Sequence, residues 1–545
     1  MKSKAEQAIE RISEIRYPLI LQGCCIGVLT GIVVSFFRRI LIAAESLRDS
    51  VLREAAGGAA ESAGMSGVPD MQPPGTAIMQ HPRMAVLLLL VLAGCFLGTW
   101  LCVRLVPLCA GSGIPQVAGE LRGRVFQPWW KVIPAKIIGG TLAIGAGLSL
   151  GREGPSIQLG AMVGKGFSSL IDRLATEEKL LMTCGAAAGL SCAFSAPLAG
   201  AVFALEGLHK NFSTDVLLGS MAASIASDFV AFYVFGLTPV FDLSIRQALP
   251  LSLYWTLAVL GVLLGFFGMI YGKCIAFTQD LYDLIPSKAG RLAVPFLLLI
   301  PLGLWYPLAM GGGYRLVTQV ADEKFVLSAL ALLLVMKFCY SILSFSAGAP
   351  GGIFMPLLVI GGVAGGLYFT AVTQILDIPQ YYIDNFVIYG MVGYFAGIVR
   401  SPVTGVILIT EMVGDFTNFL ALSVVALVAY ITADLLGSVP IYQQLLERML
   451  RGDPDCGMTD RLRRNKVLIE SDVYISSVMD GRKLKEMKLP RGCLVVSVLR
   501  GPEELVPGGD TELKGGDRLT ILCSQGRMDE ADRVLKKLCR TERIR

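Results

Sequence analysis

Apolar stretches long enough to cross a bilayer recur along most of the chain. The 21 residues from Tyr17 to Phe37 carry no charge, and neither do the 20 residues between Arg83 and Arg104. A helix needs roughly 20 apolar residues to cross the hydrocarbon core, so both stretches predict membrane spans. Similar blocks continue to about Ile441, most of them interrupted by glycine, proline or a single charge. The pattern predicts an all-α polytopic membrane protein with on the order of ten or more segments, many of them broken or tilted.

Basic residues flank this apolar region at both ends. Four precede the first span and five follow the last: Lys2, Lys4, Arg11, Arg16, Arg448, Arg451, Arg461, Arg463 and Arg464. Cytoplasmic flanks carry an excess of Lys and Arg, so we expect an even number of crossings and both termini in the cytoplasm. Residues 1–16 lack the apolar run of a signal peptide and predict a cytoplasmic helix. Residues 55–82 are rich in small residues and predict an extracellular connector.

Composition narrows the class of protein further. Hydrophobic residues make up 54% of the 545 residues and charged residues only 17%, and the mean hydropathy is +0.62. A soluble globular chain needs no such excess, so lipid is the expected solvent. The net charge of +5 lies mainly in the flanks and predicts contact with anionic lipid rather than nucleic acid. Thirteen cysteines without a CxxC pair and only two histidines predict no metal site, and no constellation typical of an enzyme or a cofactor appears.

The apolar region contains an internal repeat. AFSAPLAGAVFALE at 193–206 and IVRSPVTGVILITE at 398–411 share a small residue before proline, a glycine, and a glutamate nine residues after the proline. A related segment lies upstream of each copy: GREGP at 151–155 before the first and GGIFMP at 351–356 before the second. The proline of each upstream segment precedes the proline of its repeat copy by 42 and 46 residues, respectively. Many secondary transporters consist of two such halves, often inverted, which meet at a midplane site of broken helices.

Three short segments place glycine before proline in apolar surroundings: GSGIP at 111–115, GREGP at 151–155 and GAPGGIFMP at 348–356. Each predicts the end of one helix and the start of another, because proline fits the first helical turn and glycine allows close approach of backbone. Free N–H groups at such helix starts bind anions without the help of a positively charged side chain. A fixed positive charge would hold a permeating anion too tightly for it to leave. Ordinary kinks and caps are the alternative interpretation. The residues of interest are Gly111, Gly113, Pro115, Gly151, Arg152, Pro155, Gly352 and Pro356.

Glu153 adds a charge to one of these helix starts. An ionisable group at membrane depth is costly enough to indicate function. Its carboxylate is attracted by the same N–H groups as an anion, so the side chain and the anion should compete for one place, and protonation would release the side chain. Arg152 can pair or reach an interface and is given no transport role.

Together these segments resemble the CLC family of chloride channels and chloride/proton antiporters, over about residues 17–450. WWKVIPAK at 129–136, GGGY at 311–314 and VPIYQQLL at 439–446 strengthen the resemblance. It implies a homodimer with one anion pathway per subunit and about eighteen helices in two inverted halves. It also implies Glu153 as external gate and proton site. The implied chloride ligands are the hydroxyls of Ser112 and Tyr442 and backbone N–H groups of Ile353, Phe354 and Gly154. Serine at 112 favours chloride over nitrate or fluoride.

One position departs from the family pattern. Proton-coupled members usually carry two consecutive acids at the end of the repeat helix, the second serving as the internal proton acceptor. Here Glu206 is followed by Gly207. Glu206 points about 100° away from position 207 and is expected to be structural. Chloride/proton exchange and a passive chloride channel therefore both stay open.

The chain becomes charged and β-prone after residue 450. A linker is expected at 451–465 and a small cytosolic α/β domain at 466–545, with strands at 466–471, 493–499 and 518–523, a short helix at 482–487 and a terminal helix to about 538. LVPGGDTELKGGDRLTIL at 505–522 resembles the C-terminal regulatory domain of TrkA/RCK-type proteins. That resemblance implies either a dimerising unit or a sensor of a nucleotide or cyclic dinucleotide. It is unlike the paired CBS module of eukaryotic members and implies a prokaryotic inner membrane.

Overall fold

The structure is a computed structural model that describes residues 4–55, 82–452 and 466–539, apart from short gaps. The gaps fall at 172–174, 210–212, 323–324, 475–476 and 501–502 and within 238–246, 488–491 and 525–537. Most of the expected connector at 55–82 and of the expected linker at 451–465 lies outside the described residues. The chain divides into two compact units, one of Met1–Val117 with Pro128–Leu445, the other of Ala118–Gln127 with Leu446–Arg545.

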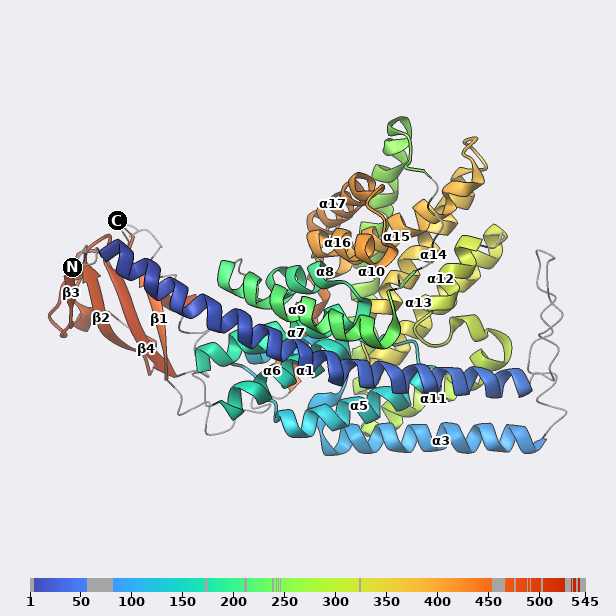
Figure 1. Ribbon diagram of the computed structural model, residues 1–545, viewed down its shortest axis with the longest axis horizontal. Coiled ribbons are helices and arrows are strands. Elements are labelled where there is room, and N and C mark those ends of the chain that lie inside the picture. Colours follow the sequence, from blue (N-terminus) through green and yellow to red (C-terminus); the bar gives the residue numbers. More distant parts are fainter. Residues whose placement is uncertain are drawn as a thin grey trace. The chain divides into compact units, whose positions relative to one another are not determined.

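Helices account for nearly all of the apolar region (Figure 1). In the first half they are α1 Lys4–Ala55, α3 Pro82–Leu105, α4 Ile114–Leu121, α5 Trp129–Ala146, α6 Glu153–Leu170, α7 Ala175–Phe194, α8 Pro197–Phe203 and α9 Thr214–Phe235. In the second half they are α10 Tyr254–Asp283, α11 Lys288–Trp305, α12 Tyr314–Asp322, α13 Leu327–Ser346, α14 Phe354–Val372, α15 Ile383–Val399, α16 Pro402–Val413, α17 Phe419–Leu435 and α18 Ile441–Gly452.

Eight helices of the described residues are long and apolar enough to cross a membrane. Others, such as α4 and α8, are far shorter, so the predicted class of polytopic protein with many broken helices is confirmed. Residues 4–16 of the expected N-terminal helix at 1–16 belong to α1. α1 begins at Lys4 and runs through Pro18 into the first span without a break, because Pro18 costs one backbone hydrogen bond and does not end the helix.

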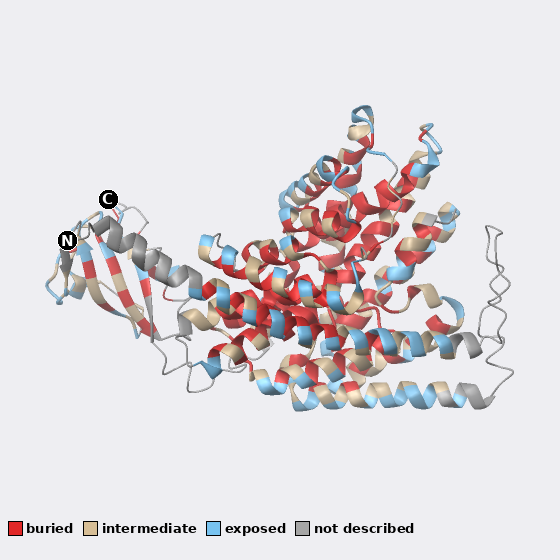
Figure 2. Cartoon of the chain, in the orientation of Figure 1, coloured by how far each residue is buried: buried red, intermediate tan, exposed pale blue. Residues whose placement is uncertain are grey.

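Two helix pairs form the buried centre of the membrane unit, α6 with α7 and α14 with α15 (Figure 2). In each pair the backbones approach closely at facing glycines. A side chain at Gly185 would collide with the carbonyl of Gly160, and one at Gly390 with the carbonyl of Gly361. Small residues allow such contact where lipid offers no hydrophobic drive for association. The same device in both halves supports the predicted internal repeat.

The repeat helices α8 and α16 hold each other by reciprocal caps. The Glu206 carboxylate, just past the end of α8, accepts hydrogen bonds from the N–H groups of Val403 and Thr404 at the start of α16, at 3.3 and 2.8 Å. The Glu411 carboxylate near the end of α16 accepts from Leu198 N and Ala199 N at the start of α8, at 3.0 and 2.8 Å. Each helix end therefore meets the start of the other helix. The equivalent helices run in opposite directions, which confirms the inverted-topology fold.

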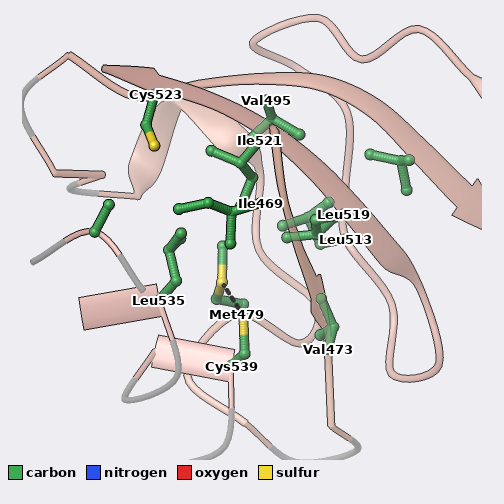
Figure 3. Close-up of a cluster of buried hydrophobic side chains, with 12 residues drawn as sticks. Ile469, Val473, Met479, Val495, Leu513, Leu519, Ile521, Cys523, Leu535 and Cys539 are labelled. Atoms are coloured by element: carbon green, nitrogen blue, oxygen red, sulfur yellow. Dashed lines mark hydrogen bonds between the residues drawn. The ribbon is translucent and has the colours of Figure 1, made fainter. Parts of the chain in front are cut away.

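The C-terminal residues form an antiparallel four-stranded sheet in the order β1-β4-β2-β3. The strands are β1 Lys466–Asp472, β2 Leu494–Arg500, β3 Glu503–Leu505 and β4 Arg518–Ser524. Their inward side chains, including Ile469, Leu519 and Ile521, pack with Met479 and Leu535 (Figure 3). The small sheet domain is confirmed, with two differences. Strand β3 was not predicted, and the expected helix at 482–487 is a single 3₁₀ turn, Leu484–Glu486. Much of the expected terminal helix lies outside the described residues.

Candidate anion site

The three glycine–proline segments meet through backbone hydrogen bonds. Gly151 and Gly352 form an antiparallel bridge in which each N–H donates to the other carbonyl, at 2.6 and 2.7 Å. Gly111 N–H donates to the Ala349 carbonyl at 3.2 Å, and Gly351 N–H donates to the Gly111 carbonyl at 3.1 Å. Segments up to 241 residues apart in the chain, from 111 to 352, therefore lie side by side. The structure brings together the three motifs that the sequence singles out.

A helix begins directly after each segment. α4 begins at Ile114, α6 at Glu153 and α14 at Phe354, so Pro115, Pro155 and Pro356 all fall in a first helical turn. The first N–H groups of a helix have no partner within it, and the helix dipole adds positive potential there. The Gly154 N–H group belongs to the first turn of α6, and Ile353 and Phe354 stand at the start of α14.

The hydroxyls of Ser112 and Tyr442 are among the buried hydroxyl groups that have no hydrogen-bond partner within the described residues. Ser112 is 2% exposed, its Oγ has no hydrogen bond, and a side chain at Gly154 would collide with it. The Tyr442 hydroxyl is also buried without a partner at the start of α18, close enough to Glu153 for an electrostatic interaction. Buried hydroxyls normally find a partner, so each is available to a bound species.

Glu153 points from its own helix start to that of α14. The carboxylate is 2% exposed, and its Oε2 has no hydrogen-bond partner. A side chain at Gly151 would collide with Oε2 and lie 3.0 Å from Met355 N, the second residue of α14. The N–H groups of Glu153 itself and of Met355 face the carboxylate. The side chain thus lies where an anion attracted by the start of α14 would lie.

Two buried lysines support the turns beside the site, and sequence reasoning missed both. Lys136 Nζ donates to the carbonyls of Cys109 and Gly111, at 2.9 and 2.6 Å. Lys337 Nζ donates to the carbonyls of Ala309 and Gly311, at 3.2 and 2.6 Å.

A second repeat could have signalled this pair. PLCAGSG at 107–113 and PLAMGGG at 307–313 share their first two residues and two glycines, each of which has a positive φ. A lysine follows the first of these glycines after 25 or 26 residues. Both ammonium groups are fully buried and bind backbone carbonyls of these turns.

Position 207 has no room for a side chain as the chain is packed. Residues Ala204–His209 form a π-helical turn after α8. A Cβ atom at Gly207 would lie 2.6 Å from the Phe203 ring. That ring stands edge-on to Phe354, with centroids 6.2 Å apart. Glu206 is engaged as the cap of α16, as expected of a structural residue. Within the described residues no cluster of His, Cys, Asp or Glu could hold a metal ion.

Broken helices that gather free N–H groups inside an apolar inverted-repeat fold define a membrane transport protein. A model of the voltage-gated chloride channel family matches residues 88–434, and a TrkA-C domain model matches residues 468–536. The H(+)/Cl(−) exchange transporter ClcA of Vibrio parahaemolyticus is 33% identical over 451 residues, which cover 80% of this chain and 91% of that protein. The chain therefore belongs to the voltage-gated chloride channel family, as an integral multi-pass membrane protein.

Two further similarities agree with this membership. ClcA of Klebsiella pneumoniae subsp. pneumoniae is 34% identical over 363 residues, covering 65% of this chain and 76% of that protein. The crystal structure of a slow cyanobacterial Cl−/H+ antiporter superposes with a TM-score of 0.71 at 26% identity, covering 80% of this chain and 99% of that one.

Proposed function

We propose that this protein exchanges chloride for protons across a prokaryotic inner membrane, with Glu153 as external gate and proton site. The observation that carries the proposal is the place of the Glu153 carboxylate at the start of α14, where the N–H groups of Glu153 itself and of Met355 face it. The names of its relatives, exchange transporters and an antiporter, support the same activity.

In this mechanism, neutral donors hold the chloride. The hydroxyls of Ser112 and Tyr442 and the N–H groups of Ile353, Phe354 and Gly154 supply hydrogen bonds without a formal charge, so the ion can leave again. Glu153 occupies the outer position as a carboxylate and leaves it when protonated. Each exchange of the carboxylate for chloride then couples one proton to anion movement.

A passive chloride channel is the second candidate, and Gly207 favours it. A proton has no carboxylate to bind at that position, and the Phe203 ring occupies the adjacent space. If the protein is an exchanger, protons reach Glu153 through water or another group.

Purified protein in liposomes distinguishes the two candidates. A chloride gradient imposed across the membrane should drive protons uphill through an exchanger. Glu153→Gln should keep chloride flux and abolish that proton movement. Proton movement that never exceeds what the membrane voltage drives would establish the channel. Proton pumping by the Glu153→Gln protein would remove Glu153 from the mechanism.

The assembly and orientation follow the family. We expect a homodimer with one pathway per subunit, both termini in the cytoplasm, and a C-terminal domain that regulates transport. A nucleotide or cyclic dinucleotide is the proposed ligand of that domain, with simple dimerisation as the alternative. The TrkA-C match supports a regulatory role.

A further inference from the structure

A second carboxylate lies inside the membrane unit, away from the glycine–proline segments. Asp228 belongs to α9, one of the eight helices able to cross a membrane, and is 2% exposed. Both of its carboxylate oxygens are buried, and neither has a hydrogen-bond partner among the described residues. An ionisable side chain at membrane depth is expensive and indicates function. The structural caps Glu206 and Glu411 differ, because their oxygens accept backbone hydrogen bonds.

The helices packed around Asp228 supply charges of both signs. α1 contributes Arg38 and Arg39, α7 contributes Cys192, and α16 contributes Glu411. α8 contains no charged residue, and the following turn carries Glu206, which caps α16. Arg38 and Glu411 interact electrostatically with Asp228, one attractive and one repulsive, and the Cys192 thiol also interacts with it.

Arg38 is held beside Asp228 without being fully paired. Its Nη1 donates to the Cys192 carbonyl at 3.1 Å, and its guanidinium lies over the Phe235 ring, 4.1 Å from the centroid. Its Nε is buried and has no hydrogen-bond partner. The positive charge of Arg38 is therefore only partly offset by neighbouring groups.

The same arginine also interacts with the candidate gate. Arg38 lies close enough to Asp228, Arg152 and Glu153 for electrostatic interactions with all three. The outer anion position is the place that the Glu153 carboxylate occupies. A change of charge at Asp228 alters the positive electrostatic potential that Arg38 produces at this position. In a poorly screened interior such an effect persists over longer distances than in water.

We propose that Asp228 is a second proton-binding residue, which acts through Arg38 on chloride binding at the outer position occupied by Glu153. When Asp228 is ionised it offsets the charge of Arg38. When Asp228 is protonated, more of that positive charge attracts chloride. Chloride binding then strengthens as the pH falls, independently of protonation at Glu153. The inference deepens the proposed function and rests on it for the location of the anion.

Chloride affinity in a background without the Glu153 carboxylate isolates this effect. Calorimetric titration of purified Glu153→Gln protein with chloride, between about pH 4 and about pH 8, avoids titration of the gate itself. We expect affinity to be higher at the acidic end by about threefold or more. In Glu153→Gln/Asp228→Asn protein the dependence on pH should vanish.

Matched variants make the outcome decisive. Asp434→Asn removes an exposed carboxylate and should leave the pH dependence of the Glu153→Gln protein unchanged. Should Asp228→Asn fail to fold, Asp228→Glu, which keeps a titratable group, and Arg38→Gln, which removes the intermediary charge, test the same link. Glu should preserve the dependence and Gln should abolish it.

Two results would overturn the proposal. One is a chloride affinity of Glu153→Gln protein that does not change with pH. The other is a pH dependence that survives either Asp228→Asn or Arg38→Gln in folded protein. Failure of the proposed function is separate. It shows as absent proton movement in wild-type liposomes, a measurement that does not enter the affinity comparison.

Discussion

The reciprocal caps of α8 and α16 provide the sharpest test of the fold. Glu206 accepts three hydrogen bonds, from Val403 N, Thr404 N and, at 2.6 Å, Thr404 Oγ1, whereas Glu411 accepts two. Replacing either glutamate by alanine leaves two N–H groups at the start of a helix without their side-chain partner. Hydrogen bonds to a charged group contribute about 1.5–3 kcal/mol each, and contributions to one carboxylate add incompletely.

We therefore expect Glu411→Ala to destabilise the protein by about 3 kcal/mol and Glu206→Ala by about 1 kcal/mol more. Glutamine retains one acceptor oxygen, so the Gln variants should recover roughly half of each loss. The measurement is the temperature at which purified protein loses its monodisperse elution in detergent. Asp377→Ala, an exposed acid, serves as the control. A Glu206→Ala protein as stable as wild type, or one more stable than Glu411→Ala, would refute the capping argument.

Three further outcomes are expected. Gly207→Glu should destabilise the protein by about 1–3 kcal/mol because the new Cβ overlaps the Phe203 ring. Phe203→Leu in the same protein should restore part of that loss. Equal stability of Gly207→Glu and wild type would contradict the close packing of Gly207 against Phe203. In the C-terminal domain, paired hydrogen bonds from Arg500 lower the pKa of Asp517. The stability that this ion pair contributes is present above the ordinary carboxyl pKa of about 4 and is lost as the pH falls through the lowered pKa. Limited proteolysis across that pH range should show a domain that becomes cleavable in acid in the wild type, and no such change in Asp517→Asn. Deleting residues 460–545 should leave basal chloride flux in liposomes and change its regulation, whereas complete loss of flux in folded protein would assign the domain a direct role in transport.

Features set by local chemistry could be predicted from the sequence. The helix starts at Ile114, Glu153 and Phe354 follow glycine–proline motifs, whose backbone restrictions act within a few residues. The repeat was visible because both copies need a glutamate at the same distance from a proline. The inversion of the repeat could not be predicted, because the sequence does not show which helix start each carboxylate caps.

Features that depend on distant partners escaped prediction. Lys136 and Lys337 sit in apolar helices as single charges, and only the fold shows that each meets the carbonyls of a turn more than 20 residues earlier. Asp228 likewise stands in a stretch typical of a lipid-facing helix, and its neighbours come from three other elements. Strand β3 has only three residues, too few for a recognisable alternation.

The crossed caps between α8 and α16 also limit how this protein can move. Transporters with inverted repeats often work by rocking one bundle against the other around a fixed site. Here such a rotation would pull both carboxylates from their helix starts together and would separate the Gly151–Gly352 bridge as well. The two halves are clasped at both ends of the same pair of helices. A rigid-body rotation of one half would therefore cost these hydrogen bonds, whereas a movement of the Glu153 side chain alone would leave all of them in place.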